Sequence, residues 1–176
     1  AASDVYKRQV VGTYWFLMMI GRLCGASIGA KVSSRAMLTV VSTVGIVLVL
    51  GAIFCADNIL VNMPVFKSDI SFGFAQVPVN VMLLILCGLC TSVMWGGIFN
   101  LAVEGLGKYT AAASGLFMVM VCGGGILPLI QGGVADFAGF LNSYWVIALG
   151  LAYILFYAAI GSKNVNTDIP TDDYEA

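Results

Sequence analysis

The sequence of 176 residues contains no histidine, and only 10% of its residues are charged. Histidine is the most frequent general base in enzymes and the commonest metal ligand, so we expect no enzyme, metal or cofactor. The formal net charge is -1 and the basic residues form no cluster, which argues against a nucleic-acid partner. Soluble domains contain about 25% charged residues, so this chain has too little polar surface to cover itself in water.

Apolar residues make up 60% of the chain, and its mean hydropathy is +0.99. Most of them lie in five stretches that together hold a single charge, and each stretch exceeds the roughly 20 residues that an α-helix needs to cross a bilayer. A transmembrane β-barrel would instead show short strands of alternating polarity. The sequence therefore predicts an all-α integral membrane protein with five transmembrane helices, at about residues 11–30, 36–55, 79–99, 111–132 and 143–161.

The basic residues of the connections indicate how these helices are oriented. Lys31 and Arg35 lie in the first connection, Lys108 lies in the third, and Lys163 opens the C-terminal tail. These three segments fall on one side of the membrane and carry four basic residues, against three on the other side when Lys7, Arg8 and Lys67 are counted. The positive-inside rule makes the first side cytoplasmic. Residues 163–176 are polar and acidic, so we expect them to form a disordered cytoplasmic tail.

The first nine residues, AASDVYKRQ, contain neither the apolar region nor the cleavage motif of a secretory signal. We interpret residues 1–9 as a non-native leader. This opening, the odd number of spans and the missing start methionine together predict a truncated chain.

Arg22 lies in the middle of the first predicted span, among glycines spaced four residues apart: Gly21, Gly25 and Gly29. Small residues at this spacing let helices approach closely in lipid, so they predict a tightly packed neighbour. An arginine deep in hydrocarbon costs roughly 3–15 kcal/mol, so Arg22 must face a polar partner or a wet cavity. We predict that it lines a cavity together with Trp15 on the same helical face; a structural ion pair or a near-surface position is the alternative.

The third span carries the next candidates, Thr91 and Trp95, one turn apart, with Asn100 near its end. Aromatic faces stack on sugar rings, while hydroxyls and amides bond sugar OH groups, so we predict that these residues line the cavity. Plain packing is the alternative for Trp95, and a helix-end contact is the alternative for Asn100. Cys87 and Cys90 have the spacing of a redox motif, but we interpret them as packing residues.

The fourth span contains three consecutive glycines followed by a proline: Gly123, Gly124, Gly125 and Pro128. These residues remove side-chain packing and one helical hydrogen bond, so they predict a bend within residues 123–128. Interrupted helices in transporters lie at binding sites or gates. Gln131, beyond the bend, is predicted to reach the cavity.

Three stretches resemble the C-terminal part of the L-fucose:proton symporter family of the major facilitator superfamily, and above all its bacterial glucose/galactose transporter branch. They read GRLCGASIGAKVSSR, FNLAVEGLGKYTAAASGLFMVMVCGGGILPLIQGGVAD and SYWVIALGLAYILFYAAIGSKN. The resemblance implies that the five spans correspond to the eighth through twelfth helices of a twelve-helix transporter in the bacterial inner membrane. Arg22 matches the arginine of the family's eighth-helix Gly-Arg pair, a cavity residue.

The resemblance also implies a function: uptake of a hexose, glucose/galactose or fucose-like, by proton symport with alternating access. The implied partners are the sugar, the coupling proton, membrane lipid and a missing N-terminal half that carries the proton-binding acids. A channel or membrane scaffold subunit without coupled transport is the alternative function, and it would show uptake independent of a proton gradient.

Overall fold

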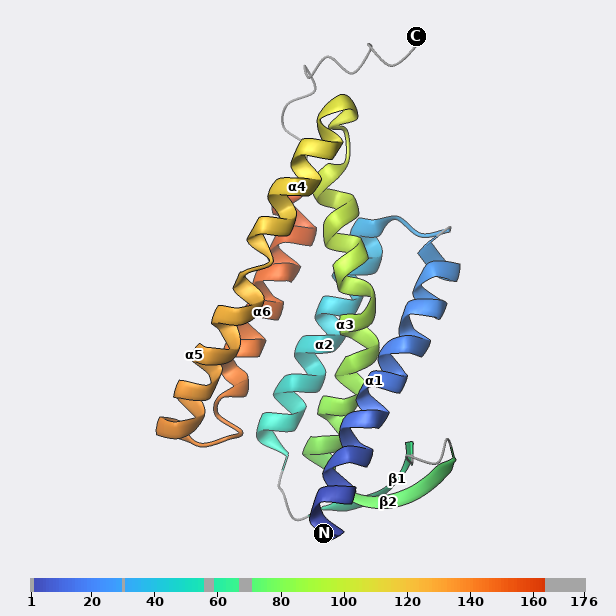
Figure 1. Cartoon of the computed structure of the whole chain (residues 1–176), viewed down its shortest axis with the longest axis vertical. Helices are drawn as coiled ribbons and strands as arrows, with labels where there is room; N and C mark the ends of the chain where they lie inside the picture. The colour runs from blue at the N-terminus through green and yellow to red at the C-terminus, as the bar shows by residue number, and fades with distance from the viewer. Residues whose placement is uncertain (1, 30, 56–58, 67–70, 164–176) are drawn as a thin grey trace.

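The computed structural model of the protein describes residues 2–29, 31–55, 59–66 and 71–163, and the predicted C-terminal tail lies almost entirely outside them. The chain folds into a bundle of antiparallel helices with a β-hairpin at one end (Figure 1). Its elements are α1 (Ala2–Gly29), α2 (Ser34–Phe54), β1 (Leu60–Phe66), β2 (Phe72–Pro78), α3 (Val79–Val103), the 3-10 turn η1 (Gly107–Tyr109), α4 (Thr110–Met120), α5 (Gly123–Ala138), α6 (Tyr144–Phe156) and the π turn η2 (Tyr157–Gly161).

Within the described residues, five helical segments are long and apolar enough to cross a membrane: Lys7–Gly29, Ser34–Phe54, Val79–Val103, Gly107–Ala138 and Tyr144–Gly161. The predicted all-α integral membrane fold with five transmembrane helices is thereby confirmed. The first helix is longer than expected, because α1 begins at Ala2 and runs without interruption through the segment interpreted as a leader. The non-native origin of that segment stays a prediction.

The interruption of the fourth span lies slightly ahead of its predicted position. Helix α4 ends at Met120 and α5 begins at Gly123, so the chain turns at Val121 and Cys122 rather than within residues 123–128. Backbone bonds at the turn are of the tight 3-10 kind, from Gly124 N to Val121 O at 2.8 Å and from Gly125 N to Cys122 O at 2.9 Å. Pro128 lies inside α5 as its sixth residue, beyond the first turn, so its missing N–H leaves Gly124 O without its regular helical donor.

The connection between α2 and α3 contains an antiparallel hairpin with the register Leu60↔Pro78 to Phe66↔Phe72. The inner face of the hairpin is buried in a small core of Met63, Val65, Val77 and Ile85, against which Val10, Tyr14 and Leu17 of α1 pack. The main core lies between α2, α3 and α6 and includes Leu38, Val49, Met94 and Leu151. Helices α4 and α5 contain no buried residue in the described chain.

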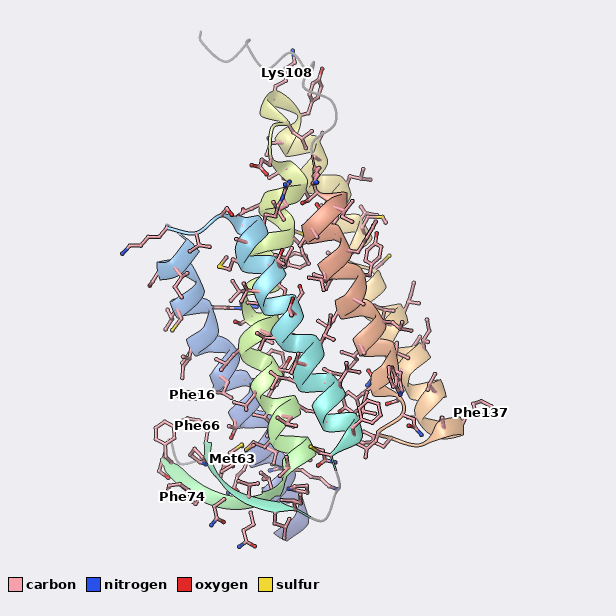
Figure 2. All side chains as sticks on the ribbon, turned by 180° about the vertical axis from the view of Figure 1, so that it is seen from behind. Phe16, Met63, Phe66, Phe74, Lys108 and Phe137 are labelled. Atoms are coloured by element: carbon pink, nitrogen blue, oxygen red, sulfur yellow. The ribbon has the colours of Figure 1, made fainter. Side chains whose placement is uncertain are left out.

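The connections gather at the two ends of the bundle (Figure 1). One end carries the α1–α2 turn, the α3–α4 turn and the chain beyond η2. These segments are joined directly, since Arg35 Nη2 donates to Ser162 O at 3.0 Å. Figure 2 shows Lys108 at this end and Phe137 toward the other. Asp136, expected in a connection, lies in the last turn of α5.

Candidate functional site

The contact between α1 and α3 is built from glycines on both helices. A Cβ atom at Gly21 would overlap Ser92 Oγ and lie 3.1 Å from Leu89 O, and one at Gly25 would lie 2.9 Å from Val93 Cγ2. Gly29 differs, because the nearest atom to its added Cβ is Met37 Cε at 3.8 Å. The close approach of the two helices therefore depends on Gly21 and Gly25.

Arg22 is exposed and lines a groove of about 310 Å³ between α1 and α3. Glycines, which have no side chain, form part of the groove walls. The polar residues that line the groove besides Arg22 are Ser34, Ser92 and Asn100. The span ends at Gly29, so Arg22 lies about 10 Å along the helix axis from that end rather than in the middle of the span. The groove continues from Arg22 to Ser34 and Asn100, so it carries polar side chains toward this end of the bundle.

Trp15 and Arg22 lie on one side of α1, as their spacing predicts. The two residues line a smaller hollow of about 210 Å³ with Met18 and Met19. The indole of Trp15 is 61% exposed, so this face of α1 is open along two turns.

Thr91 lines a second groove, of about 610 Å³, that lies toward the hairpin end of the bundle. Thr91 Oγ1 donates to Gly88 O at 3.2 Å and lies 3.3 Å from Tyr14 Oη. Because the threonine proton is used by Gly88, the tyrosine hydroxyl is the donor to Thr91. Gln131 of α5 lines the same groove, so a hydroxyl pair and an amide share one largely apolar space.

Trp95 of α3 packs toward α4. The ring centroid of Trp95 lies 5.3 Å from that of Phe117. The ring of Phe117 is also contacted by Phe99, with centroids 5.5 Å apart. The indole nevertheless remains 45% exposed. Trp95 thus combines a packing contact with an accessible aromatic face.

The predicted site residues are therefore distributed over separate places. Arg22 and Asn100 share one groove, Thr91 and Gln131 share another, and Trp95 lies at the α3–α4 contact. The glycines of the fourth span, Gly123, Gly124 and Gly125, have nothing within 4 Å of an added Cβ, and Pro128 is exposed.

The sequence did not lead us to Tyr14. The Tyr14 ring lies against Gly88, so that a Cβ atom added at Gly88 would be 2.9 Å from Tyr14 Cδ2, and the Tyr14 hydroxyl bonds Thr91. A signal was present, because Tyr14 lies two helical turns before Gly21 and so belongs to the same packed face. Cys87 and Cys90, which flank Gly88, are buried free thiols in the main core.

No protein-family model and no solved structure matches the chain. The chain is similar to a Helicobacter pylori protein provisionally named glucose/galactose transporter, with 32% identity over 155 residues, 85% of this chain and 33% of the relative. It is 44% identical to a glucose/galactose transporter of Brucella abortus over 77 residues, 44% of this chain and 19% of the relative. The L-fucose-proton symporter of Escherichia coli is 33% identical over 92 residues, 52% of this chain and 21% of the relative.

The fold defines the class of the protein, an integral membrane protein built from transmembrane helices. Within this class, the chain belongs to the sugar-transporter family of the major facilitator superfamily that contains these three relatives. The predicted family resemblance is confirmed. The aligned stretch spans a third or less of the length of each relative.

Proposed function

We propose that the chain forms the C-terminal part of a secondary transporter that takes up a hexose, glucose/galactose or fucose-like, by proton symport. The observation that carries this proposal is the similarity to proteins named as glucose/galactose transporters and as an L-fucose-proton symporter. The five spans correspond to the eighth through twelfth helices of a twelve-helix fold, and an N-terminal half completes the cavity.

The two grooves support an alternating-access mechanism. One is lined by Arg22 and Asn100 and lies toward the end with the basic connections; the other is lined by Thr91 and Gln131 and lies toward the hairpin. The closely packed Gly21–Ser92 contact belongs to the helix pair that separates them. Access from one end at a time would then require only that the N-terminal half close one groove while the other is open.

Arg22 is proposed to face a carboxylate of the N-terminal half. The attraction between a guanidinium and a carboxylate depends on protonation of the acid, which links proton binding to the arrangement of the two halves. An exposed arginine in a polar groove supports this role, since no acidic side chain within the described part of the chain pairs with it.

The membrane orientation is proposed from charge. Lys31, Arg35, Lys108 and Lys163 are all placed at or beside one end of the bundle by their elements. The positive-inside rule makes this end cytoplasmic, which puts the C-terminal tail on the cytoplasmic side of the bacterial inner membrane.

The test is uptake of labelled glucose, galactose and fucose by inverted and right-side-out vesicles that contain the full-length gene product. We expect accumulation that collapses with a protonophore. The Arg22→Ala variant should lose accumulation against a gradient, with Ser27→Ala, another exposed residue of α1, as the matched control. Undiminished accumulation by Arg22→Ala would reject the coupling role, and uptake insensitive to the protonophore would favour a channel.

A further inference from the structure

The β-hairpin has two faces of different character. Its inner residues Met63, Val65 and Val77 are buried at 7%, 1% and 0% exposure. On its outer face Phe72 and Phe74 are 65% and 79% exposed, although both are large and apolar. The register pairs Phe74 with Pro64 and Phe72 with Phe66, so the aromatic part of this face occupies the half of the hairpin farther from α3, while the exposed Leu60 lies at the other end.

Packing fixes the hairpin to the side of a transmembrane helix. Phe66 N donates to Thr13 Oγ1 at 2.9 Å, and the ring of Phe66 stacks on Phe16 with centroids 5.1 Å apart and planes inclined by 8°. Phe72 also contacts Phe16, at 5.4 Å. The aromatic rings of the outer face are therefore continuous with a side chain of the α1 span.

The level of the hairpin along the bundle follows from both of its anchors. Thr13 and Phe16 lie in the second and third turns of the span Lys7–Gly29. At the other anchor, β2 ends at Pro78, which caps α3 and leads directly into the span Val79–Val103. Both anchors place the hairpin where transmembrane helices enter the bilayer.

The aromatic outer face of the hairpin also points away from Arg22. Phe16 and Arg22 are six residues apart, which separates their directions by about 120° around the helix. Figure 1 shows β1 and β2 lying across the helix axes and reaching past α1, on the side away from α2 and α6. Figure 2 shows Phe16, Phe66 and Phe74 gathered at this edge of the molecule.

We propose that the apolar outer face of the hairpin, formed by Pro64, Phe66, Phe72 and Phe74, is a membrane-anchoring surface that inserts into the headgroup layer of the adjacent leaflet. A two-stranded sheet has open edges, whose N–H and C=O groups need water or polar headgroups, so it is excluded from the hydrocarbon core. The headgroup layer satisfies these groups and still accepts phenyl rings, as it does for amphipathic helices. The inference concerns a lipid contact and does not depend on sugar transport.

The test places a fluorescent thiol label on the outer face. The five native cysteines are replaced by serine or alanine, and Phe74→Cys is labelled with an environment-sensitive dye in vesicles of phosphatidylcholine and phosphatidylglycerol. Gln76→Cys is the matched control, because Gln76 lies on the same strand and face but pairs with Asn62 in the polar half. Equal helix content by circular dichroism shows that both variants fold.

We expect the label at position 74 to emit at shorter wavelength than the label at 76. It should also be quenched several-fold more strongly by lipids with a nitroxide near the headgroup, and more weakly by iodide in the water. Strong iodide quenching at both positions would overturn the proposal by showing a face open to water. Protection from iodide and from lipid nitroxides alike would overturn it by showing that protein covers the face.

Discussion

At the scale of single residues, Gly21 and Gly29 belong to one stripe but differ in their surroundings. A methyl group at Gly21 would meet Ser92 and the backbone of Leu89, whereas one at Gly29 would meet only the flexible end of Met37. The spacing of the glycines predicted a neighbour for the whole stripe. Only the path of α3 relative to α1 determines which glycines touch it.

We expect Gly21→Ala to lower the free energy of unfolding by about 1–3 kcal/mol, because the added methyl group must push the two helices apart. Gly29→Ala is the control and should cause no loss, since its site is open. Thermal unfolding in detergent, followed by circular dichroism, measures both. Equal stability of the two variants would show that α1 and α3 do not pack as closely as described.

Trp95 offers a second test at this scale. If its exposed face binds the sugar, Trp95→Phe should keep most of the affinity, while Trp95→Ala should weaken binding about tenfold, or about 1.4 kcal/mol. Phe117→Ala is the control, because it removes the ring contact at 5.3 Å without removing the indole. Binding to the full-length transporter by calorimetry is the measurement; equally small effects at position 95 would leave packing as its role.

At the scale of elements, one hydroxyl helps to hold the hairpin on α1. Thr13 is buried, accepts from Phe66 N at 2.9 Å and donates to Gln9 O at 2.7 Å. Thr13→Val should destabilise the hairpin by about 1–3 kcal/mol, because it removes the acceptor of a partly buried donor. Thr13→Ser keeps the hydroxyl and should behave like the parent. Hydrogen exchange at the amides of β1 reads out the difference, and unchanged protection in Thr13→Val would contradict the contact.

At the turn between α4 and α5, we expect substitutions that change transport activity without lowering thermal stability. An added Cβ meets nothing within 4 Å at Gly123, Gly124 or Gly125. Alanines there should therefore fit, and each should favour helix by up to about 1 kcal/mol. If the turn must bend during transport, the triple alanine variant should lose turnover while keeping its thermal stability.

The control for this variant lies in the same helix. Gly132 and Gly133 are equally open but lie beyond Pro128, so alanine at both should leave turnover unchanged. Initial uptake rates and melting temperatures of the two variants decide the matter. A similar loss of turnover in both would show that α5 tolerates no stiffening, rather than that the turn is a hinge.

The sequence predicted the helices better than it predicted the hairpin, for a physical reason. Long uncharged runs predict the spans directly, because any transmembrane helix requires such a run. Strand β1 reads LVNMPVF, with apolar residues on both faces and Pro64 inside, so the alternation that marks a half-buried strand is blurred. The separation of Thr91 from Arg22 into different grooves was equally hidden, since it depends on how helices pack and not on the composition of any one helix.

At the scale of the whole molecule, the orientation in the membrane can be checked at two positions near the ends of the bundle. Lys108 and Phe137, the latter 97% exposed, lie toward opposite ends of the bundle (Figure 2). In a cysteine-free background, Lys108→Cys should react with a membrane-impermeant thiol reagent only in inverted vesicles, and Phe137→Cys only in right-side-out vesicles. The reverse pattern would invert the proposed topology, and labelling of both from one side would contradict the antiparallel bundle.

The bond from Arg35 to Ser162 has a consequence for synthesis. It joins the start of α2 to the end of α6 across 127 residues. This bond can form only after Ser162 has been synthesised, so this end of the bundle closes only once α6 has followed α2 into the bilayer. Closure of this region is therefore a post-insertional event.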